Sequence, residues 1–416
     1  MRKNDIDTQH KINRMTKRLI FVFFALIMLS ACSKPKDNKA YLRTVLNNLV
    51  KVESATYLST REGWAPGDTA ASTHMDHYRK EYNNPLDTTI GASFVSLLQS
   101  DTTQMAFCYD GKINAVVFEE EKFTGIDSFK VRKLPYRPIA PPFFNYTKSI
   151  IKYALETRDS ISIKLEELEK SFHFSLTIFE DKQVEFLGKA FYMEDNDNPL
   201  IYGDPTSKYE IWIDKKTDLP FKVRREMSHD TTIETVRNVE LNKTNIKDFK
   251  AVNYFPKNYP LINPGERNPN QKESNLLGKK APVWTLTDTN DKKLSLIDLQ
   301  SKVVMIQFTS VSCGPCRVSI PFLNGLTSTY KKKDFDFVAI ECTANSMNAE
   351  KFYLTKCGIN YKFLKSTKSV LEEYKIKSFP VFFILDKDLI IRKVINGYGK
   401  GTTDTEIKDN IDKMIN

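Results

Sequence analysis

Histidine and cysteine are scarce in this 416-residue chain, which has five histidines, none after His229, and six cysteines. Without a histidine in the C-terminal part, a cysteine–histidine nucleophile cannot be built there. A single Cys-x-x-Cys pair with no histidine nearby does not complete a zinc site. His74 and His77 lie in a polar stretch with no third ligand within reach in the sequence. The sequence therefore predicts neither a metal ion nor a cofactor.

A strong excess of one charge is also absent. The formal net charge is +10, and residues 1–31 contribute +4 of it through six Lys/Arg and two Asp. No stripe of interleaved basic and aromatic residues follows, so the sequence predicts no nucleic-acid partner. With 41% hydrophobic and 12% aromatic residues, the chain has enough apolar side chains for packed cores. Its length suits two or three domains.

The N-terminus has the features of an export signal. Lys17-Arg18 is followed by eleven apolar residues and then by Ser30-Ala31-Cys32. Eleven helical residues rise only about 16 Å, short of the roughly 30 Å hydrocarbon core, so a spanning helix is the weaker interpretation. Leu29-Ser30-Ala31-Cys32 resembles the lipobox of bacterial lipoproteins, which implies a signal peptide over 1–31 and a lipid on Cys32.

After the lipobox, residues 32–39 form a polar tether. The resemblance implies a bacterial envelope protein that is lipid-anchored in an envelope membrane and faces the periplasm. The alternative is an ordinary secretory signal in which Cys32 occurs by chance.

Residues 40–255 are predicted to form a mainly antiparallel β domain. Apolar residues alternate on both sides of Asp110-Gly111, which is a strong hairpin signal. A helix is predicted over 39–52, where leucine and valine recur at helical spacing. Further alternating runs lie at 161–165, 172–178, 209–213 and 221–223.

A leading helix followed by long strands such as YDGKINAVVF and IWIDKKTDLPFKVR resembles the half-barrel of LolA/LppX-type proteins. That resemblance implies a cradle for lipid or lipoprotein acyl chains. The alternative is an α+β scaffold that spaces the next domain from the membrane or docks a partner.

The composition changes twice in the C-terminal half. Prolines and polar residues dominate 256–276, which is predicted to be a linker. From 277 to 416, continuous apolar strands alternate with helices, as is typical of an α/β sheet covered on both faces. The predicted elements are a hairpin at 286–299, buried strands at 302–308 and 335–340, helices from 315, at 349–357 and at 369–374, a hairpin at 381–395, and a last helix from 403.

Chemistry is concentrated at Cys313-Gly314-Pro315-Cys316, which follows a buried strand and begins a helix. The first helical turn presents unpaired N–H groups that favour a thiolate, and Pro315 fits there because its missing N–H would have no partner. We therefore predict Cys313 as the exposed nucleophile and Cys316 as the shielded resolving thiol. A purely structural disulfide is the weaker interpretation, because closing so short a loop constrains the unfolded chain little and so stabilises the fold only slightly.

The segment 277–416 resembles the TlpA/ResA-like branch of the thioredoxin superfamily. The resemblance rests on the stretch LLGKKAPVWTLTDTNDKKLSLIDLQSKVVMIQF, on the CGPC motif, and on Ser378-Phe379-Pro380 before an apolar strand. It implies a thioredoxin fold with a cis peptide bond at Pro380. It also implies that an extended protein disulfide substrate docks on the main chain of Phe379.

Three positions depart from the pattern of that family. Ser312 replaces an aromatic residue, Gln307 replaces the buried acid of thioredoxins, and Ser319 replaces a glutamate common in ResA-like reductases. Glu341, at the end of the second buried strand, is a candidate substitute for these acids. The alternative is a solvated strand end, because glutamate is rarely buried unless it is paired.

Three more cysteines lie outside the motif. Cys342 and Cys357 either form a second disulfide or stay free and buried, and Cys108 is expected to be a packed thiol.

Together, the residues and the resemblance predict an envelope thiol–disulfide oxidoreductase that reduces protein disulfides. Gly-Pro is the thioredoxin-type spacer, associated with a potential of about −270 mV. A membrane electron donor would regenerate the dithiol, because the envelope lacks a reducing pool. Two alternatives stay open: a disulfide oxidase or isomerase, and a non-enzymatic lipid-binding or docking lipoprotein with a vestigial redox domain.

Overall fold

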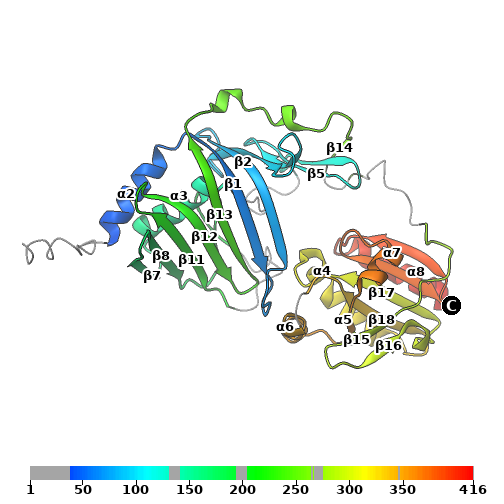
Figure 1. Cartoon of the computed structure of the whole chain (residues 1–416). Coiled ribbons are helices and arrows are strands. Elements are labelled where there is room, and N and C mark those ends of the chain that lie inside the picture. Colours follow the sequence, from blue (N-terminus) through cyan, green and yellow to red (C-terminus); the bar gives the residue numbers. More distant parts are fainter. Residues whose placement is uncertain are drawn as a thin grey trace, which may run out of the picture.

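The computed structural model describes residues 38–130, 141–193, 204–263, 266, 275–344 and 347–415 (Figure 1). The predicted signal peptide, Cys32 and most of the tether lie outside these ranges. None of the helices in the described ranges combines the length and the apolar character needed to cross a membrane.

The N-terminal domain, residues 38–263, is organised around one open, curved sheet of twelve strands. Its order is β14-β6-β5-β4-β3-β2-β1-β13-β12-β11-β8-β7, antiparallel except for the β14–β6 pair. The strands are β1 (Ser54–Trp64), β2 (Thr73–Asn83), β3 (Ala92–Leu98), β4 (Met105–Tyr109), β5 (Asn114–Phe118), β6 (Phe123–Asp127), β7 (Ile161–Glu167), β8 (Ser171–Ile178), β11 (Ser207–Asp214), β12 (Leu219–Met227), β13 (Asp230–Leu241) and β14 (Leu261–Ile262). β9 (Val184–Phe186) and β10 (Ala190–Tyr192) form a separate pair.

Two helices contribute to the largest hydrophobic core of this domain. α2 (Asn38–Val50) buries Leu42, Val45 and Leu49 at helical spacing, which confirms the predicted first helix. α3 (Phe143–Glu156), which the sequence did not predict, places Phe143 and Phe144 in the same core as residues of β8, β11 and β12. This apolar surface of the sheet is therefore filled by side chains of the chain itself. The short helices η1 (Ile246–Asp248) and η2 (Ala251–Tyr254) follow β13.

The predicted hairpin at Asp110-Gly111 is confirmed, with β4 and β5 on either side. β1, β2 and β13 were not predicted, because their alternation is broken by buried residues that are polar in β1 and charged in β2 and β13. Glu81 accepts hydrogen bonds from the Tyr57 hydroxyl at 2.6 Å and from two main-chain amides at the start of α3. Arg79 Nη1 lies 3.2 Å from Glu234 Oε1. These partners compensate for the cost of burying charge.

The C-terminal domain, residues 275–415, has the thioredoxin fold predicted from the sequence. Its seven-stranded sheet has the order β16-β15-β19-β18-β17-β20-β21, with β17, β18 and β19 parallel. Its strands are β15 (Thr285–Asp288), β16 (Lys293–Ser295), β17 (Val303–Thr309), β18 (Phe335–Glu341), β19 (Lys362–Lys365), β20 (Val381–Asp386) and β21 (Ile391–Asn396). Its helices are η3 (Leu296–Asp298), α4 (Gly314–Val318), α5 (Ile320–Thr329), α6 (Met347–Cys357), α7 (Lys368–Tyr374) and α8 (Thr402–Ile415).

The two faces of this sheet carry separate cores, because successive side chains of a strand point to opposite faces. Val303 and Met305 of β17 pack with α5, α6 and α8, whereas Val304 and Ile306 pack on the other face with α7 and η3. β19 was not predicted, because its four residues, Lys362–Lys365, hold only two buried side chains.

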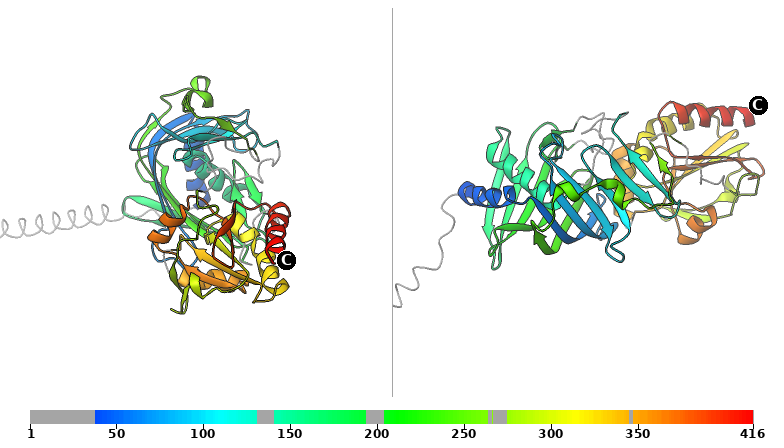
Figure 2. Two further views of the ribbon diagram at one scale, coloured as in Figure 1. Left: turned by 90° about the vertical axis from the view of Figure 1, so that its right-hand side faces the viewer. Right: turned by 90° about the horizontal axis from the view of Figure 1, so that it is seen from above.

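The β1–β2 hairpin of the N-terminal domain contacts the C-terminal domain beside α6 (Figure 1). Ala65 belongs to the same core as Ala349 of α6. An ion pair of 2.9 Å joins Lys377 to Glu120. Seen from above, α2 lies at one end of the molecule and the C-terminal domain at the other (Figure 2).

Candidate active site

Cys313 and Cys316 form a disulfide where β17 gives way to α4, with their Cα atoms 5.2 Å apart. All seven residues of β17 are buried, so the strand fixes the position of the loop that follows it. Cys313 is the N-cap of α4, and its main-chain amide donates to the carbonyl of Ser310 at 3.0 Å. The short run of helix thus begins at the first cysteine, as the motif predicted.

The two sulfurs have different environments. Cys313 is partly exposed, and its Sγ accepts a hydrogen bond from the main-chain amide of Cys316 at 3.1 Å. Cys316 is only 1% exposed. After reduction, an N–H aimed at Cys313 Sγ favours a thiolate there, whereas burial keeps Cys316 in the thiol form. The geometry therefore supports the predicted roles of nucleophile and resolving thiol.

The Phe379–Pro380 peptide bond is cis, as the resemblance implied. β20 runs antiparallel to β17 with Val381 opposite Phe308, so the start of β20 lies beside the end of β17 that leads to Cys313. The carbonyl of Pro380 accepts from the amide of Gly397 at 2.7 Å, which ties the loop to the end of β21. Phe379 itself makes no main-chain hydrogen bond to another described residue.

A neutral pair occupies the two positions where the family often has acids. Gln307 and Ser319 are both buried, and Gln307 Nε2 donates to Ser319 Oγ at 3.3 Å. Ser319 Oγ in turn donates to the carbonyl of Cys316 at 2.5 Å. The pair braces the main chain of α4 and offers no carboxylate to take a proton from Cys316.

Glu341 is buried, with 1% of its surface exposed, so the alternative of a solvated strand end is wrong. Its Oε1 accepts from the amides of Thr343 and Ala344 at 2.7 and 2.9 Å and from the Thr343 hydroxyl at 2.9 Å. Burial raises the pKa of Glu341 to about 7, against the opposing effect of these hydrogen bonds and with help from the nearby charge of Glu350. A carboxyl in that range exchanges its proton near neutral pH.

The other three cysteines in the described ranges are free thiols. Cys342 and Cys357 are free, so the alternative of a second disulfide is not realised. Cys342 Sγ donates to the carbonyl of Ile340 at 3.2 Å, and burial raises the pKa of this thiol. Cys108 is a packed thiol, as expected, and burial raises its pKa to about 12. None of the three lies at the start of a helix, as Cys313 does.

The histidines of the N-terminal domain have local partners. His74 lies within 3.1 Å of Asp76, and His77 packs edge-on against the ring of Phe107. Burial lowers the pKa of His229, in the turn between β12 and β13, and among the charges around it Arg317 makes the smallest contribution in the same direction. Because Arg317 directly follows Cys316, the fold brings a histidine toward the redox motif from the other domain, which sequence spacing did not indicate.

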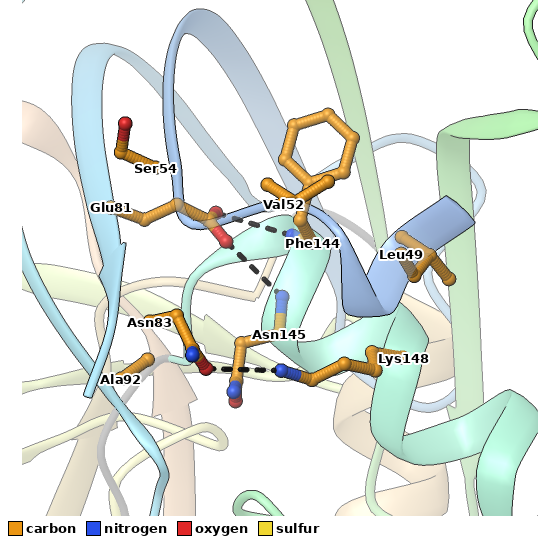
Figure 3. A pocket seen from close by; sticks show the side chains of 9 residues that line it. All are labelled: Leu49, Val52, Ser54, Glu81, Asn83, Ala92, Phe144, Asn145 and Lys148. Atoms are coloured by element: carbon orange, nitrogen blue, oxygen red, sulfur yellow. Dashed lines mark hydrogen bonds between the residues drawn. The ribbon is translucent and has the colours of Figure 1, made fainter. Parts of the chain in front are cut away.

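A small cleft lies at the start of α3 in the N-terminal domain (Figure 3). Its cavity volume is about 10 Å³, far below the roughly 300–1,000 Å³ of most small-molecule sites. Glu81 bonds the amides of Phe144 and Asn145 inside it, and Lys148 reaches Asn83 at 3.4 Å. These groups are hydrogen-bonded to one another, and the bonds from α3 to Glu81 and Asn83 hold the start of that helix in place.

The C-terminal domain is similar to known redox proteins. A model of the Redoxin family matches residues 276–411. Thiol-disulfide oxidoreductase ResA of Bacillus thuringiensis is 30% identical over 118 residues, which cover 28% of this chain and 68% of the relative. ResA of Bacillus cereus is 31% identical over 127 residues, covering 30% and 72%. The solved thioredoxin domain of a thiol-disulfide oxidoreductase from Bacteroides vulgatus is 24% identical, covering 34% of this chain and 98% of that one, with a TM-score of 0.29.

Proposed function

The chain belongs to the ResA-like family of thiol-disulfide oxidoreductases, and from this we propose that it is a lipid-anchored envelope reductant of protein disulfides. The observation that carries the proposal is the asymmetric pair at the start of α4, with Cys313 partly exposed and Cys316 buried. Exchange needs one thiol that meets the substrate and a second that meets only the first.

The catalytic cycle follows from this asymmetry. The Cys313 thiolate attacks a substrate disulfide, so that a Cys313–substrate bond forms and the first substrate sulfur leaves as a thiolate and takes up a proton. Cys316 then loses its proton and attacks Cys313 Sγ, which releases the second substrate sulfur. The enzyme ends as the disulfide, and two electrons have passed to the substrate.

Phe379 provides the docking site for the substrate in this proposal. Its main-chain groups are not used by the described fold, and antiparallel pairing of β17 and β20 holds it beside the disulfide. An extended segment that pairs with this main chain would present its own disulfide to Cys313, as in β-strand addition. Recognition through main-chain atoms tolerates many sequences.

Reduction of insulin disulfides by the purified full-length chain, with dithiothreitol as donor, tests the activity. Cys313→Ser should abolish catalysis, and Cys316→Ser should accumulate the mixed disulfide. Cys108→Ser serves as the matched control and should retain the wild-type rate. Full activity in Cys313→Ser would refute the assignment.

The direction of electron flow is tested by the potential of the Cys313/Cys316 pair in dithiothreitol and glutathione buffers. A value near or below about −250 mV supports a reductant that is regenerated by a membrane electron donor. A value above about −180 mV would point to an oxidase or isomerase.

The lipid anchor is tested separately from the redox activity. Incorporation of labelled fatty acid into the wild-type chain, and its loss in Cys32→Ala, is the expected result. A wild-type chain that takes up no label would make the N-terminus an ordinary secretory signal.

For the N-terminal domain we propose a scaffold that holds the redox site away from the anchored end. α2 follows the predicted tether and lies at the end of the molecule opposite the C-terminal domain (Figure 2). The LolA/LppX-type carrier stays a prediction, although the core of α2, α3 and the sheet already covers the apolar surface that an acyl chain would need. Binding of a fluorescent fatty acid that persists in Cys313→Ser would favour the carrier.

A further inference from the structure

Glu341 lies on the same side of the sheet as the redox helix. Its register partner on β17 is Thr309, two residues beyond the Gln307–Ala339 pair. Gln307 bonds Ser319 at the junction of α4 and α5, so that face of the sheet is the one α4 and α5 cover. Because alternate residues of a strand share a face, Glu341 is on this face too, at the end of β18 beside the strand end that leads to Cys313.

A chain of hydrogen bonds joins Glu341 to the loop before Cys313. The single hydroxyl proton of Thr343 is donated to Glu341 Oε1. Ser310 must therefore be the donor in its 2.6 Å contact with Thr343 Oγ1. Ser310 Oγ in turn accepts from the main-chain amide of Ser312, the residue before Cys313. Every donor in the chain thus points toward the carboxylate.

The two oxygens of Glu341 have different roles. Oε1 accepts all three donors, whereas Oε2 is buried and has no hydrogen-bond partner among the described residues. A buried carboxylate oxygen without a donor is costly when charged. A proton on Oε2 removes that cost and leaves the bonds at Oε1 intact, so Oε2 is the atom where a proton is held.

We propose that Glu341 is a positioning residue that holds one proton at the redox site when Cys313 is a thiolate and releases it when the disulfide closes. This rests on the thiol–disulfide exchange proposed above. In the reduced enzyme the two protons lie on Cys316 and on Glu341 Oε2. Oxidation by a substrate disulfide delivers both protons to the two substrate thiols, and the negative charge passes from Cys313 to Glu341.

The sign of the pH dependence follows from like-charge repulsion. In the disulfide form burial raises the pKa of Glu341 to about 7, and a thiolate at Cys313 raises it further in the reduced form. Above about pH 7 the reduced form therefore binds one proton more at this carboxyl. The equilibrium constant for reduction then falls by an additional tenfold per pH unit, which is 29.6 mV for a two-electron couple.

Other charged and titratable groups face this site. Glu350 of α6 raises the pKa of Glu341, and Lys365 of β19 lies 3.6 Å from Glu350. Cys342 is the adjacent thiol, and its own pKa is raised. On β17 the residue in register is the neutral Thr309. These groups stay the same in the two redox states, so the change at Cys313 sets the difference.

The test is the equilibrium of the full-length chain with dithiothreitol across pH 6 to 9, read by alkylation and mass spectrometry. Wild type should show the steeper region above about pH 7, and Glu341→Gln should lack it. Asp336→Asn is the matched control, because Asp336 lies on the same strand near its start and pairs with Lys362. This control should follow the wild type.

Thr343→Val keeps the experiment decisive if Glu341→Gln does not fold. Loss of one donor should raise the pKa of the carboxyl and move the steep region to higher pH. The role of Glu341 would be overturned by any of three results. The curves of wild type and Glu341→Gln could superimpose, or the curve of Thr343→Val could stay in place. Alternatively, Asp336→Asn could lose the steeper region as fully as Glu341→Gln. A wild-type chain that never equilibrates with dithiothreitol would instead reject the exchange activity itself.

Discussion

Replacing Gly67 with alanine is expected to loosen the contact between the two domains. Gly67 has a φ of +87°, and a Cβ there would lie 3.0 Å from the nitrogen and 3.1 Å from the Cα of Ala349 in α6. Main-chain atoms of a helix cannot rotate away, so the β1–β2 hairpin and α6 must separate by a few tenths of an ångström to make room. Gly401 has a similar φ of +84° with nothing within 4 Å of its Cβ position, which makes Gly401→Ala the matched control.

The two variants share one energetic cost and differ in the other. A left-handed conformation costs an L-residue about 1–2 kcal/mol, and both alanines bear it. Overpacking against fixed atoms adds about 1–3 kcal/mol at Gly67 alone. Since each 1.4 kcal/mol is a tenfold change in an equilibrium constant, docking of the hairpin should weaken by roughly one to two orders of magnitude.

Hydrogen exchange read by mass spectrometry measures this loss. Amides of the β1–β2 turn and of α6 should exchange faster in Gly67→Ala than in the wild type, whereas Gly401→Ala should leave them unchanged. Equal protection of α6 in all three proteins would show that the hairpin does not depend on this close approach, and the inferred contact would then be wrong.

Three smaller predictions concern single side chains. Tyr57→Phe removes a hydroxyl that donates to buried Glu81 at 2.6 Å, so urea denaturation should show a loss of about 1–3 kcal/mol; an unchanged midpoint would contradict this. Lys377→Ala breaks an exposed ion pair with Glu120, and the change should stay below about 1 kcal/mol. Cys108, fully buried with a pKa raised to about 12, should resist iodoacetamide in the folded protein at pH 8 and react only after denaturation.

The fold of the C-terminal domain could be predicted because its signals are local. β17 and β18 are runs of buried residues, as strands covered on both faces must be. The CGPC motif needs only a strand before it and a helix after it. Most boundaries were off by one or two residues, but the hairpin predicted at 286–299 ends at Ser295. The helix predicted from 315 is divided into α4 and α5 at Ser319, two residues before Pro321.

The N-terminal domain was harder to predict because its largest strands bury charge. β2 reads as polar, yet Arg79 and Glu81 point into the structure, where Glu234 and the start of α3 neutralise them. No local pattern indicates such a pair, because the partners are separated by 155 residues for Arg79 and Glu234. The approach of His229 to Arg317 was missed for the same reason, since it joins two domains.

The difference between local and long-range signals also explains which parts of the active site could be predicted from the sequence. Cys313, Cys316 and Pro380 are defined by short motifs and were predicted. The link from Glu341 through Thr343 to Ser310 depends on two strands ending side by side, which only the register of β17 and β18 establishes.

The surroundings of the cysteines favour a reductant over an oxidant. A thioredoxin-type pair becomes strongly oxidising when its reduced form is stabilised, chiefly through its thiolate. Here the Cys313 sulfur accepts one hydrogen bond, from the Cys316 amide, at the start of a helix of only five residues. The buried pair beneath Cys316, Gln307 and Ser319, is neutral and adds no positive charge. With its proton on Oε2, as proposed for the reduced form, Glu341 is also neutral and adds no positive charge beside the thiolate. A thiolate that is only modestly stabilised is what a donor of electrons to protein disulfides requires, so we expect a potential on the reducing side.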